Sequence, residues 1–487
     1  MPRPHTRVSL SLVVLCAVAL SLWVTRQGPG LGLDSANYIA AARSLAQGDG
    51  VRARDGEPLT HYPPGYPVVL ALSTAVGADP LHGARVIDAM LFALLVGVVG
   101  LVAWRASRSG WVALVAAGLV LTTPDLATLG GMAMSESLAI ALGLAGLAGL
   151  AVARDDDDRR AFYGSALAIA GSILTRYAAG AFWLAGATLL VVWRRPRAAL
   201  RWSVVVWLPV LAWLVRNRLV AATATHRELA WHPPPWAELH TALATLGGWL
   251  LVTPRLSALA AAAGVAALIG LGVVAVRERH PIARALALGA LAYLLCLYLA
   301  RTVADAVIPF DARLLSPAGV FLAALLPILA ACHWPRAHWL VIVAVLLLAV
   351  KARQTVIWAR VAARNGLELQ HYSWRDSRTL AHLPSGGPLY VNWAAVPYLL
   401  RGRNVAELPR RLISSSWHPN PDYRAEVERM RSTGGWVVYL DTWATPAIFP
   451  TADQLREALP LTLVDSSADG RIYRIDGPAD HGAGAAR

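Results

Sequence analysis

The stretch Asp34-Ser-Ala-Asn-Tyr-Ile-Ala-Ala-Ala-Arg-Ser-Leu-Ala-Gln-Gly48, followed later by His61-Tyr-Pro-Pro-Gly-Tyr-Pro67, decides how the chain is interpreted. The first part has the apolar spacing of a helix, and Gly48 is typical of a residue at which a helix ends. Asp34 stands where that helix begins, and a carboxylate there can cap free backbone N–H groups. The second part contains three prolines and a glycine, which predicts a rigid turn in place of a regular helix.

The composition is that of a membrane protein. Of the 487 residues, 56% are apolar and 15% are charged, whereas soluble domains have about 25% charged residues. The net charge of +14 comes mostly from arginines in short loops, without a dense basic tail. It therefore indicates membrane topology and no nucleic-acid partner. The three cysteines lie in or beside apolar runs without metal-ligand spacing, so no disulfide framework is expected.

Apolar runs of near-bilayer length recur along the chain. Because no cleavage site follows the first run, it is interpreted as a signal anchor. With the N-terminus inside, every short inner loop contains arginine and the outer loop 122–133 contains none, as the positive-inside rule requires. Two shorter apolar segments, 64–77 and 236–252, are interpreted as interfacial or half-inserted helices. The eleven predicted spans are 8–24, 85–104, 111–129, 134–153, 161–178, 179–193, 202–219, 256–276, 284–301, 315–332 and 338–352.

From about residue 353 the chain becomes polar enough to be water-soluble. Its pattern alternates strands with helices and contains no Gly-rich nucleotide motif, which predicts a small α/β domain. Asn392 is a plausible N-cap of the first of its helices. Strands are expected at 388–392 and 436–440, helices at 393–401, 422–430 and 453–458, and a closing hairpin at 461–464 and 471–475. The chain is thus predicted to divide into a helical membrane module, 1–352, which includes an outer loop at 25–84, and an extracytoplasmic α/β domain, 353–487.

Charged residues at the ends of spans gather on the predicted outer side, where Asp34 also lies. A charge at membrane depth costs at least a few kcal/mol, so such residues usually face a polar cavity. Taken singly, each could be a side chain that reaches the headgroups from a helix end. Their accumulation on one side predicts a single outward-facing cavity. The residues are Glu136, Arg176, Arg216 with the adjacent Asn217, Asp311 and Arg313.

An Asp after the first span, the pattern Tyr38-x-x-x-Ala-x-x-Leu-x-x-Gly48, and Tyr62-Pro-Pro-Gly-Tyr-Pro67 before a second span resemble the polytopic GT-C glycosyltransferases. The resemblance is to glycosyltransferase family 39, with its protein O-mannosyltransferases and lipid A aminoarabinose transferases. Many of these enzymes have Asp-Glu where this chain has Asp34-Ser35. The resemblance implies a GT-C fold of about eleven spans in the cytoplasmic (inner) membrane. It also implies transfer of a sugar from a polyprenyl phosphate on the outer face.

The resemblance also implies roles for the residues. Arginines would bind the donor phosphate and stabilise the charge it gains, with Arg313 first, in Arg-x-x-x-Pro, and Arg216 and Arg176 as further candidates. Asp34 would take the proton of the acceptor, and direct displacement would invert the anomeric centre. Glu136 would orient the acceptor or share a divalent cation with Asp34, although two carboxylates do not define a metal site. The substrate pocket would be lined by His61, Tyr62, Tyr66, Asn217 and Asp311.

Three other classes of membrane protein share some of these features. A lipid-linked polysaccharide polymerase or ligase would have a similar basic outer pocket, although usually with a large loop late in the chain. A transporter or flippase would have many spans, but often with paired repeats, and no repeat is found here. A non-catalytic scaffold would leave the charged cluster unexplained. The sequence does not identify the sugar, the metal dependence or the oligomeric state, nor whether the acceptor is a protein, a lipid or a glycan.

Overall fold

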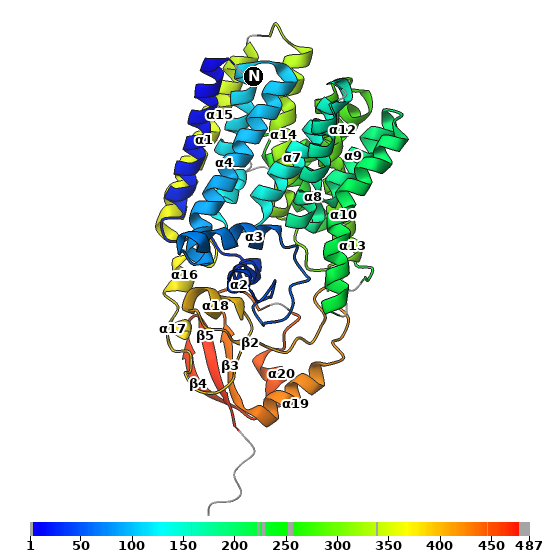
Figure 1. Ribbon diagram of the computed structural model, residues 1–487. Coiled ribbons are helices and arrows are strands. Elements are labelled where there is room, and N and C mark those ends of the chain that lie inside the picture. The colour runs from blue at the N-terminus through cyan, green and yellow to red at the C-terminus, as the bar shows by residue number, and fades with distance from the viewer. Residues whose placement is uncertain are drawn as a thin grey trace, which may run out of the picture.

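The protein has a bundle of long helices with a small sheet at one end (Figure 1). The computed structural model describes residues 3–156, 158–221, 225, 229–251, 257–337, 339–445 and 447–476. Residues 256 and 338, at which two predicted spans start, and residues 477–487 of the predicted C-terminal domain lie outside the described residues. In Figure 1 the bundle and the sheet-containing region are separated by α2 (Leu33–Gln47) and α3 (Gly65–Ala71).

Each predicted span falls on a helix. Eight described helices are long and apolar enough to cross a bilayer, or nine if one bent pair counts as a single span. Three of the eleven are shorter, at 13, 17 and 13 residues, so the count of eleven spans stays a prediction. The helices are α1 (Pro4–Val24), α4 (Pro80–Ser107), α5 (Gly110–Thr122), α7 (Glu136–Asp156), α8 (Arg159–Thr175), α9 (Gly180–Val192), α10 (Pro196–Val220), α12 (Ser257–Arg277), α13 (Pro281–Val303), α14 (Ala312–His333) and α15 (Trp339–Asn365).

The span predicted at 111–129 is wrong as one continuous helix. The chain bends by 80° after α5 and continues as α6 (Pro124–Ala127) and the 3-10 helix η2 (Thr128–Gly131). Pro124 explains the break, because the ring of a proline disfavours the helical conformation of the residue before it. Thr123 is accordingly extended, with φ −94° and ψ 115°.

The helices α7 and α14 form the centre of the bundle, and most of their residues are buried. Phe182 of α9 stacks at 5.2 Å on Phe321 of α14 and at 5.8 Å on Tyr293 of α13. By contrast, α1, α10 and α15 expose long rows of apolar side chains, which is the surface that lipid tails cover. The protein is therefore an integral membrane protein with several spans.

The helix α2 confirms one expectation and corrects another. It ends at Gly48, which adopts the left-handed conformation with φ +85°. It begins one residue before Asp34, and its N-cap is Gly32, whose N–H donates to the hydroxyl of Ser35 at 3.0 Å. The expectation that Asp34 caps the helix is wrong, because Ser35 supplies the cap. The carboxylate of Asp34 remains in the first turn and is available for other contacts.

The turn expected at 61–67 is helical in its last part. Pro64 is the N-cap of α3 and Pro67 lies in its first turn, where a missing N–H costs no hydrogen bond. The 3-10 helix η1 (Leu72–Val76) follows. Gly65 is needed for close packing, since a Cβ there would lie 2.8 Å from the carbonyl oxygen of Leu174 at the end of α8.

The C-terminal region contains a five-stranded sheet in the order β2-β1-β3-β5-β4. The predicted strands, the three helices and the closing hairpin are confirmed, although Asn392 caps no helix. Its side-chain amide instead bonds both backbone polar groups of Leu440 on the neighbouring strand. The elements are β1 (Leu389–Val391), β2 (Ala406–Glu407), β3 (Gly435–Leu440), β4 (Leu461–Ser467), β5 (Gly470–Ile475), α16 (Tyr372–Arg375), α17 (Arg378–Ala381), α18 (Ala395–Arg401), α19 (Tyr423–Thr433) and α20 (Ala452–Arg456); α11 (Trp236–Gly248) lies earlier in the chain.

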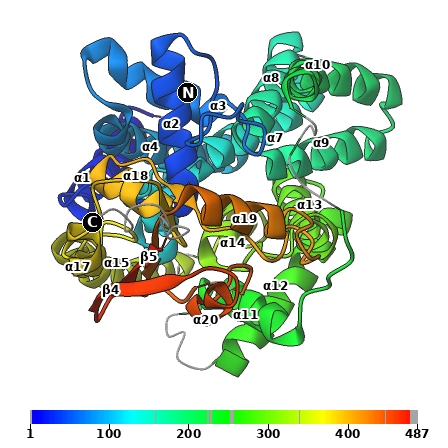
Figure 2. The ribbon, with the colours of Figure 1, turned by 90° about the horizontal axis from the view of Figure 1, so that it is seen from below.

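One hydrophobic core joins this region to α2 and α3. Tyr38 and Tyr66 belong to the same buried cluster as Trp374, Val391 and Val438. Figure 2 shows α18 and α19 lying across the end of the bundle. The helix α15 runs on to residue 365, past the domain boundary predicted at 352/353, which stays a prediction.

Candidate active site

Three segments that are distant in the sequence pair their backbones just before α2. The N–H of Gly30 donates to the carbonyl of Gly131 at 2.7 Å, and the N–H of Ala133 donates to the carbonyl of Gly30 at 2.8 Å. On the other side, the N–H of Leu369 donates to the carbonyl of Leu31 at 3.2 Å. A Cβ on Gly30 would lie 2.9 Å from the carbonyl oxygen of Gly131, so glycine is required there. This pairing sets the N-terminus of α2 beside that of α7.

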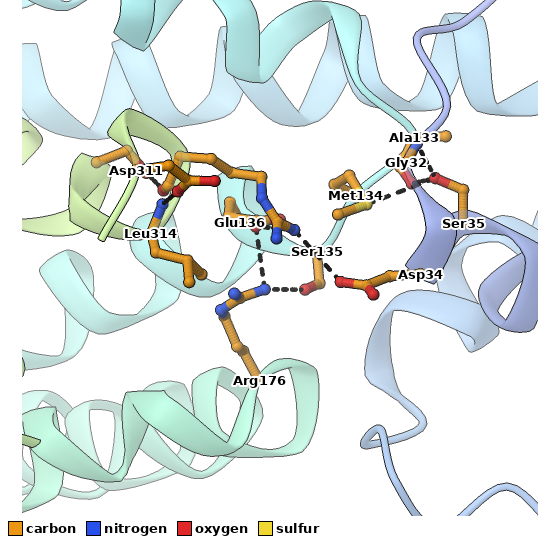
Figure 3. A network of polar contacts seen from close by, with 12 residues as sticks. Gly32, Asp34, Ser35, Ala133, Met134, Ser135, Glu136, Arg176, Asp311 and Leu314 are labelled. Carbon is orange, nitrogen blue, oxygen red and sulfur yellow. Dashed lines mark hydrogen bonds and ion pairs between the residues drawn. The ribbon is translucent and has the colours of Figure 1, made fainter. Parts of the chain in front are cut away.

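Four of the predicted residues, Asp34, Glu136, Arg176 and Arg313, form one cluster here. Figure 3 labels the first three. The Nη1 atom of Arg313 lies 3.3 Å from Oδ2 of Asp34 and 3.1 Å from Oε1 of Glu136. The Nη1 atom of Arg176 lies 3.1 Å from the same oxygen of Glu136, and it also donates to the hydroxyl of Ser135 at 3.2 Å. The four charged side chains come from α2, α7, the end of α8 and α14, so only the folded chain assembles them.

The two acids differ in their access to solvent. The side chain of Asp34 is 28% exposed and that of Arg313 is 29% exposed. Glu136 is 2% exposed and Arg176 is 16% exposed. Both acids lie in the first turn of a helix, where the positive end of the helix dipole stabilises negative charge. Asp34 is therefore the acid that a substrate can reach, and Glu136 lies behind it.

The surroundings of Asp34 hold it ionised. The hydroxyl of Tyr62 donates to Oδ1 of Asp34 at 2.8 Å. Burial raises the pKa of the Asp34 carboxyl, but the charge of Arg313 and the hydrogen bond from Tyr62 outweigh it, with smaller help from Arg176 and His61. The pKa consequently lies below the ordinary value of an aspartate, so this carboxylate is charged at neutral pH.

A row of tyrosines lies beside Asp34. The ring of Tyr62 packs at 5.0 Å against that of Tyr38, which packs at 5.1 Å against that of Tyr66. His61 lies edge-on to Tyr62 at 4.6 Å. Tyr66 is fully buried and its hydroxyl donates to both oxygens of Asp88, at 2.8 and 2.9 Å. Sequence reasoning missed Asp88, although an acid within the predicted span 85–104 was a usable signal.

The remaining predicted residues lie outside the four-residue cluster. Arg216 donates to the carbonyls of Val51 and Leu59 and to the side chain of Asn217, at 3.1 to 3.3 Å. The hydroxyl of Tyr177 accepts from Asn217 and donates to the carbonyl of Thr60. This group therefore holds the loop before Tyr62 at Val51, Leu59 and Thr60. Separately, Asp311 is the N-cap of α14 and accepts from the N–H of Leu314 at 2.8 Å, which orients the turn that carries Arg313.

The charged cluster does not have the form of a metal site. Among the described residues, no group of three or more His, Cys, Asp or Glu side chains is placed to share a metal ion. The space between Asp34 and Glu136 is taken by a nitrogen of Arg313. An arginine there competes directly with a cation for the two carboxylates, so the pair as arranged does not fit a divalent metal.

Comparisons with known proteins agree with this fold. Residues 55–218 match the family model described as dolichyl-phosphate-mannose-protein mannosyltransferase, a segment that includes Glu136, Arg176 and Arg216. No curated protein sequence matches the chain. The structure is similar to that of ArnT from Cupriavidus metallidurans bound to undecaprenyl phosphate, with a TM-score of 0.58 and 15% identity over 95% of this chain and 97% of that one.

A second solved structure shares the architecture. The archaeal oligosaccharyltransferase AglB from Archaeoglobus fulgidus, in complex with an inhibitory peptide and a dolichol-phosphate, has a TM-score of 0.50 and 12% identity, over 90% of this chain and 70% of that one. The resemblance to GT-C enzymes noted in the sequence is thus confirmed at the level of the fold. The chain therefore has the GT-C fold, and residues 55–218 match the mannosyltransferase family model.

Proposed function

We propose that the protein transfers a sugar from a polyprenyl-phosphate donor to an acceptor hydroxyl or amine. The observation that carries the proposal is the cluster of Asp34, Glu136, Arg176 and Arg313, in which an accessible ionised acid touches an accessible arginine. Transfer from a phosphodiester-linked sugar needs one group to take a proton and another to stabilise a leaving phosphate. The structures of ArnT and AglB hold undecaprenyl phosphate and dolichol-phosphate, which supports a lipid phosphate as carrier.

Asp34 is the catalytic base in this proposal. The acceptor attacks the anomeric carbon, its proton passes to Asp34, and the bond from that carbon to the phosphate oxygen breaks with its electron pair on the phosphate. As the new bond forms, the acceptor proton becomes acidic enough for a carboxylate of low pKa to take it. A single displacement of this kind inverts the anomeric centre. The hydrogen bond from Tyr62 fixes the second oxygen of Asp34 at 2.8 Å.

Glu136 holds the two arginines in this proposal. Its oxygen Oε1 contacts both Arg176 and Arg313 at 3.1 Å, and its side chain is 2% exposed. Removing it would leave the guanidinium groups of Arg176 and the more exposed Arg313 close together without their shared partner, which is unfavourable. We assign Glu136 to placing Arg313, so that it acts on the donor through that side chain.

The donor phosphate binds at the arginines. Arg313 is the most accessible arginine in the cluster and is the first candidate, with Arg176 behind it. The hydrogen bonds of Arg216 in the described part of the chain go to carbonyl and amide oxygens, which leaves its charge uncompensated. That favours Arg216 as a second anion contact across the loop 51–62. His61, Tyr62, Asn217 and Asp311 lie around these groups and complete the proposed pocket, with Tyr66 packed beneath.

We place this reaction on the outer face of the cytoplasmic membrane. The short loops that contain arginine lie at the end of the bundle opposite the cluster, as the positive-inside rule requires for an outward-facing site. The sheet-containing region lies at the same end as the cluster and is extracytoplasmic in this arrangement. The acceptor stays open between a protein, a lipid and a glycan, and the sugar is not assigned.

The test compares Asp34→Asn with the wild type. Membranes that contain each protein are incubated with a panel of radiolabelled polyprenyl-phosphate hexoses and pentoses, and labelled product is measured. Asparagine keeps the shape of aspartate but takes no proton at neutral pH, so turnover should fall about 10²- to 10⁴-fold while donor binding is kept. Asp55→Asn, an exposed acid in the same outer loop, is the control and should behave as wild type. Wild-type membranes that label no product with any donor would refute the proposed function.

A further inference from the structure

We infer that Asp88 is a positioning residue for Asp34, and that it acts through the hydroxyl of Tyr66 and the tyrosine row that leads to the site. This inference rests on the proposed function and adds a residue to its machinery. Asp88 lies in α4 and does not touch the charged cluster. Its influence passes through Tyr66, Tyr38 and Tyr62.

The burial of Asp88 is the first observation. It is 2% exposed and lies in a helix long and apolar enough to span the membrane. Among the described residues no basic side chain forms an ion pair with it, and both of its oxygens accept from the hydroxyl of Tyr66. An acid at membrane depth is costly, and such residues are usually functional. At a position that served only for apolar packing, leucine would be more stabilising than aspartate.

The continuity of contacts is the second observation. Tyr66 is 0% exposed and Tyr38 is 1% exposed, so neither ring can move without its neighbours. Tyr66 meets Tyr38 edge-on, at 83°, and Tyr38 meets Tyr62 at 58°. Tyr62 then donates the hydrogen bond that lowers the pKa of Asp34. The tether at Asp88 thus fixes a row of rings whose last hydroxyl orients the proposed base.

The charged and titratable groups around Asp34 and Asp88, at the two ends of the tyrosine row, determine how activity depends on pH. Asp34 faces Arg313 from α14, Arg176 from the end of α8, and His61 and Tyr62 from the outer loop. Asp88 faces Tyr66 from α3 and the charge of Glu136 from α7. A variant in which the ring of Tyr62 is no longer held in place weakens its hydrogen bond to Asp34, which is one of the contacts that lower the pKa of Asp34. The acid limb of activity then moves to higher pH, because the base must be ionised to act.

The experiment replaces Asp88 with leucine and with asparagine in the full-length protein. Asp88→Leu removes the acceptor, so kcat should fall by up to about 10²-fold, since small misplacements of reacting groups cost that much. The donor KM should stay within about twofold, and the acid limb of the pH profile should rise. Asp88→Asn keeps an oxygen for Tyr66 and should restore most of the activity. Tyr439→Phe, which removes a buried and hydrogen-bonded hydroxyl far along the chain, is the matched control and should leave kcat unchanged.

Tyr66→Phe tests the same inference independently, and it can be used if Asp88→Leu does not insert into the membrane. It should reproduce the fall in kcat and the shift of the acid limb. The double variant Asp88→Leu/Tyr66→Phe should have a kcat no lower than that of the more impaired single variant, because the two residues act as a unit. Wild-type kinetics in folded Asp88→Leu and Tyr66→Phe would overturn the inference, as would an Asp88→Asn variant as impaired as Asp88→Leu. A wild type without turnover would instead refute the proposed function.

Discussion

The groups around Asp34 determine whether the proposed base is ionised. Burial is the largest single effect on its carboxyl and raises the pKa, whereas Arg313 and the hydrogen bond from Tyr62, with smaller contributions from Arg176 and His61, together lower it. The balance leaves the pKa below the ordinary 3.8. Arg313 thus serves two purposes in the proposed mechanism, because it keeps the base ionised and is also the first contact for the donor phosphate.

Replacing Arg313 with glutamine should therefore change the pH profile. Without that charge, the largest of the effects that lower the pKa of Asp34 is lost, so this pKa rises. The base must be ionised, so activity should be lost at a higher pH than in the wild type as the solution is acidified. The residual kcat/KM of Arg313→Gln, measured from pH 3.5 to 8, checks this. Arg474→Gln is the control, because it removes an exposed arginine of the sheet that pairs with Asp476. If the acid limb of the pH profile does not move in Arg313→Gln, the ionisation of Asp34 does not control that limb.

At the residue scale, the sequence predicted the members of the cluster by the cost of charge at membrane depth. That argument located Glu136, Arg176 and Arg313 without any structure. It could not separate Arg216 from them, because all four are arginines or acids at outer helix ends and the distances between those ends depend on the packing. Ser135 and Tyr38 were missed, since uncharged polar residues at such positions give no comparable signal.

At the scale of elements, the close approach of α3 to α8 is what places the tyrosine row. A Cβ on Gly65 would lie 2.8 Å from the carbonyl oxygen of Leu174 and 2.8 Å from the hydroxyl of Thr175. Neither the backbone oxygen nor the buried hydroxyl can give way easily. The glycine of the Tyr-Pro-Pro-Gly-Tyr-Pro motif is thus explained by packing as well as by chain geometry.

Gly65→Ala should push α3 away from α8. Overpacking of this kind typically costs about 1–3 kcal/mol, and the shift should also lower kcat because Tyr66 lies next in the chain. Thermal unfolding of the purified protein in detergent and turnover measure the two effects. Gly164→Ala is the matched control: it lies within α8, nothing is within 4 Å of its added Cβ, and alanine favours a helix. Equal stability of the two variants would contradict the packing argument.

Element types were predicted more reliably than their ends. Apolar runs found the helices of the bundle, and alternating patterns found the strands, because both follow from periodic burial. The caps of α2 and of α18 were assigned to the wrong residues: the hydroxyl of Ser35 accepts from the N-cap of α2 in place of Asp34, and hydrogen bonds to Leu440 compete with capping for the side chain of Asn392. Such competition is decided by neighbours that the sequence does not show.

At the scale of the molecule, one hydrophobic cluster joins the sheet region to α2, α3 and the first part of α4. Trp374 is 1% exposed and belongs to the cluster that contains Tyr38 and Tyr66. Arg43 of α2 adds a polar link, with Nε 2.8 Å from Asp79 and Nη1 2.9 Å from the hydroxyl of Tyr398 in α18. The sheet region therefore packs against the elements that form the wall of the candidate site.

Trp374→Ala should destabilise the whole protein, although the residue lies outside the proposed site. Truncation of a buried tryptophan typically costs about 3–5 kcal/mol. Because the core is shared, unfolding should remain a single transition at lower temperature, and turnover should fall together with it. Calorimetry of the detergent-solubilised protein checks this, with the exposed Trp231→Ala as control. A separate early transition confined to the sheet region would contradict a shared core.

The proposed orientation can be tested by thiol labelling. In a variant with Cys16, Cys296 and Cys332 replaced by serine, single cysteines at Glu57 and Glu428 should react with a membrane-impermeant maleimide in intact cells. A cysteine at Arg197, in the first turn of α10 beside the loop that contains Arg194 and Arg195, should react only after the membrane is opened, as the positive-inside rule predicts. Labelling of position 428 only in opened cells would place the sheet region inside and reverse the proposed topology.

The backbone pairing before α2 has a consequence for biosynthesis. Leu31 lies near the start of the chain, and one of its hydrogen-bond partners, Leu369, is made more than three hundred residues later. A nascent chain on the ribosome consequently lacks one side of the segment that presents Asp34 until its last quarter has emerged. Prematurely terminated chains that end before Leu369 should therefore not act on the proposed lipid-phosphate donor.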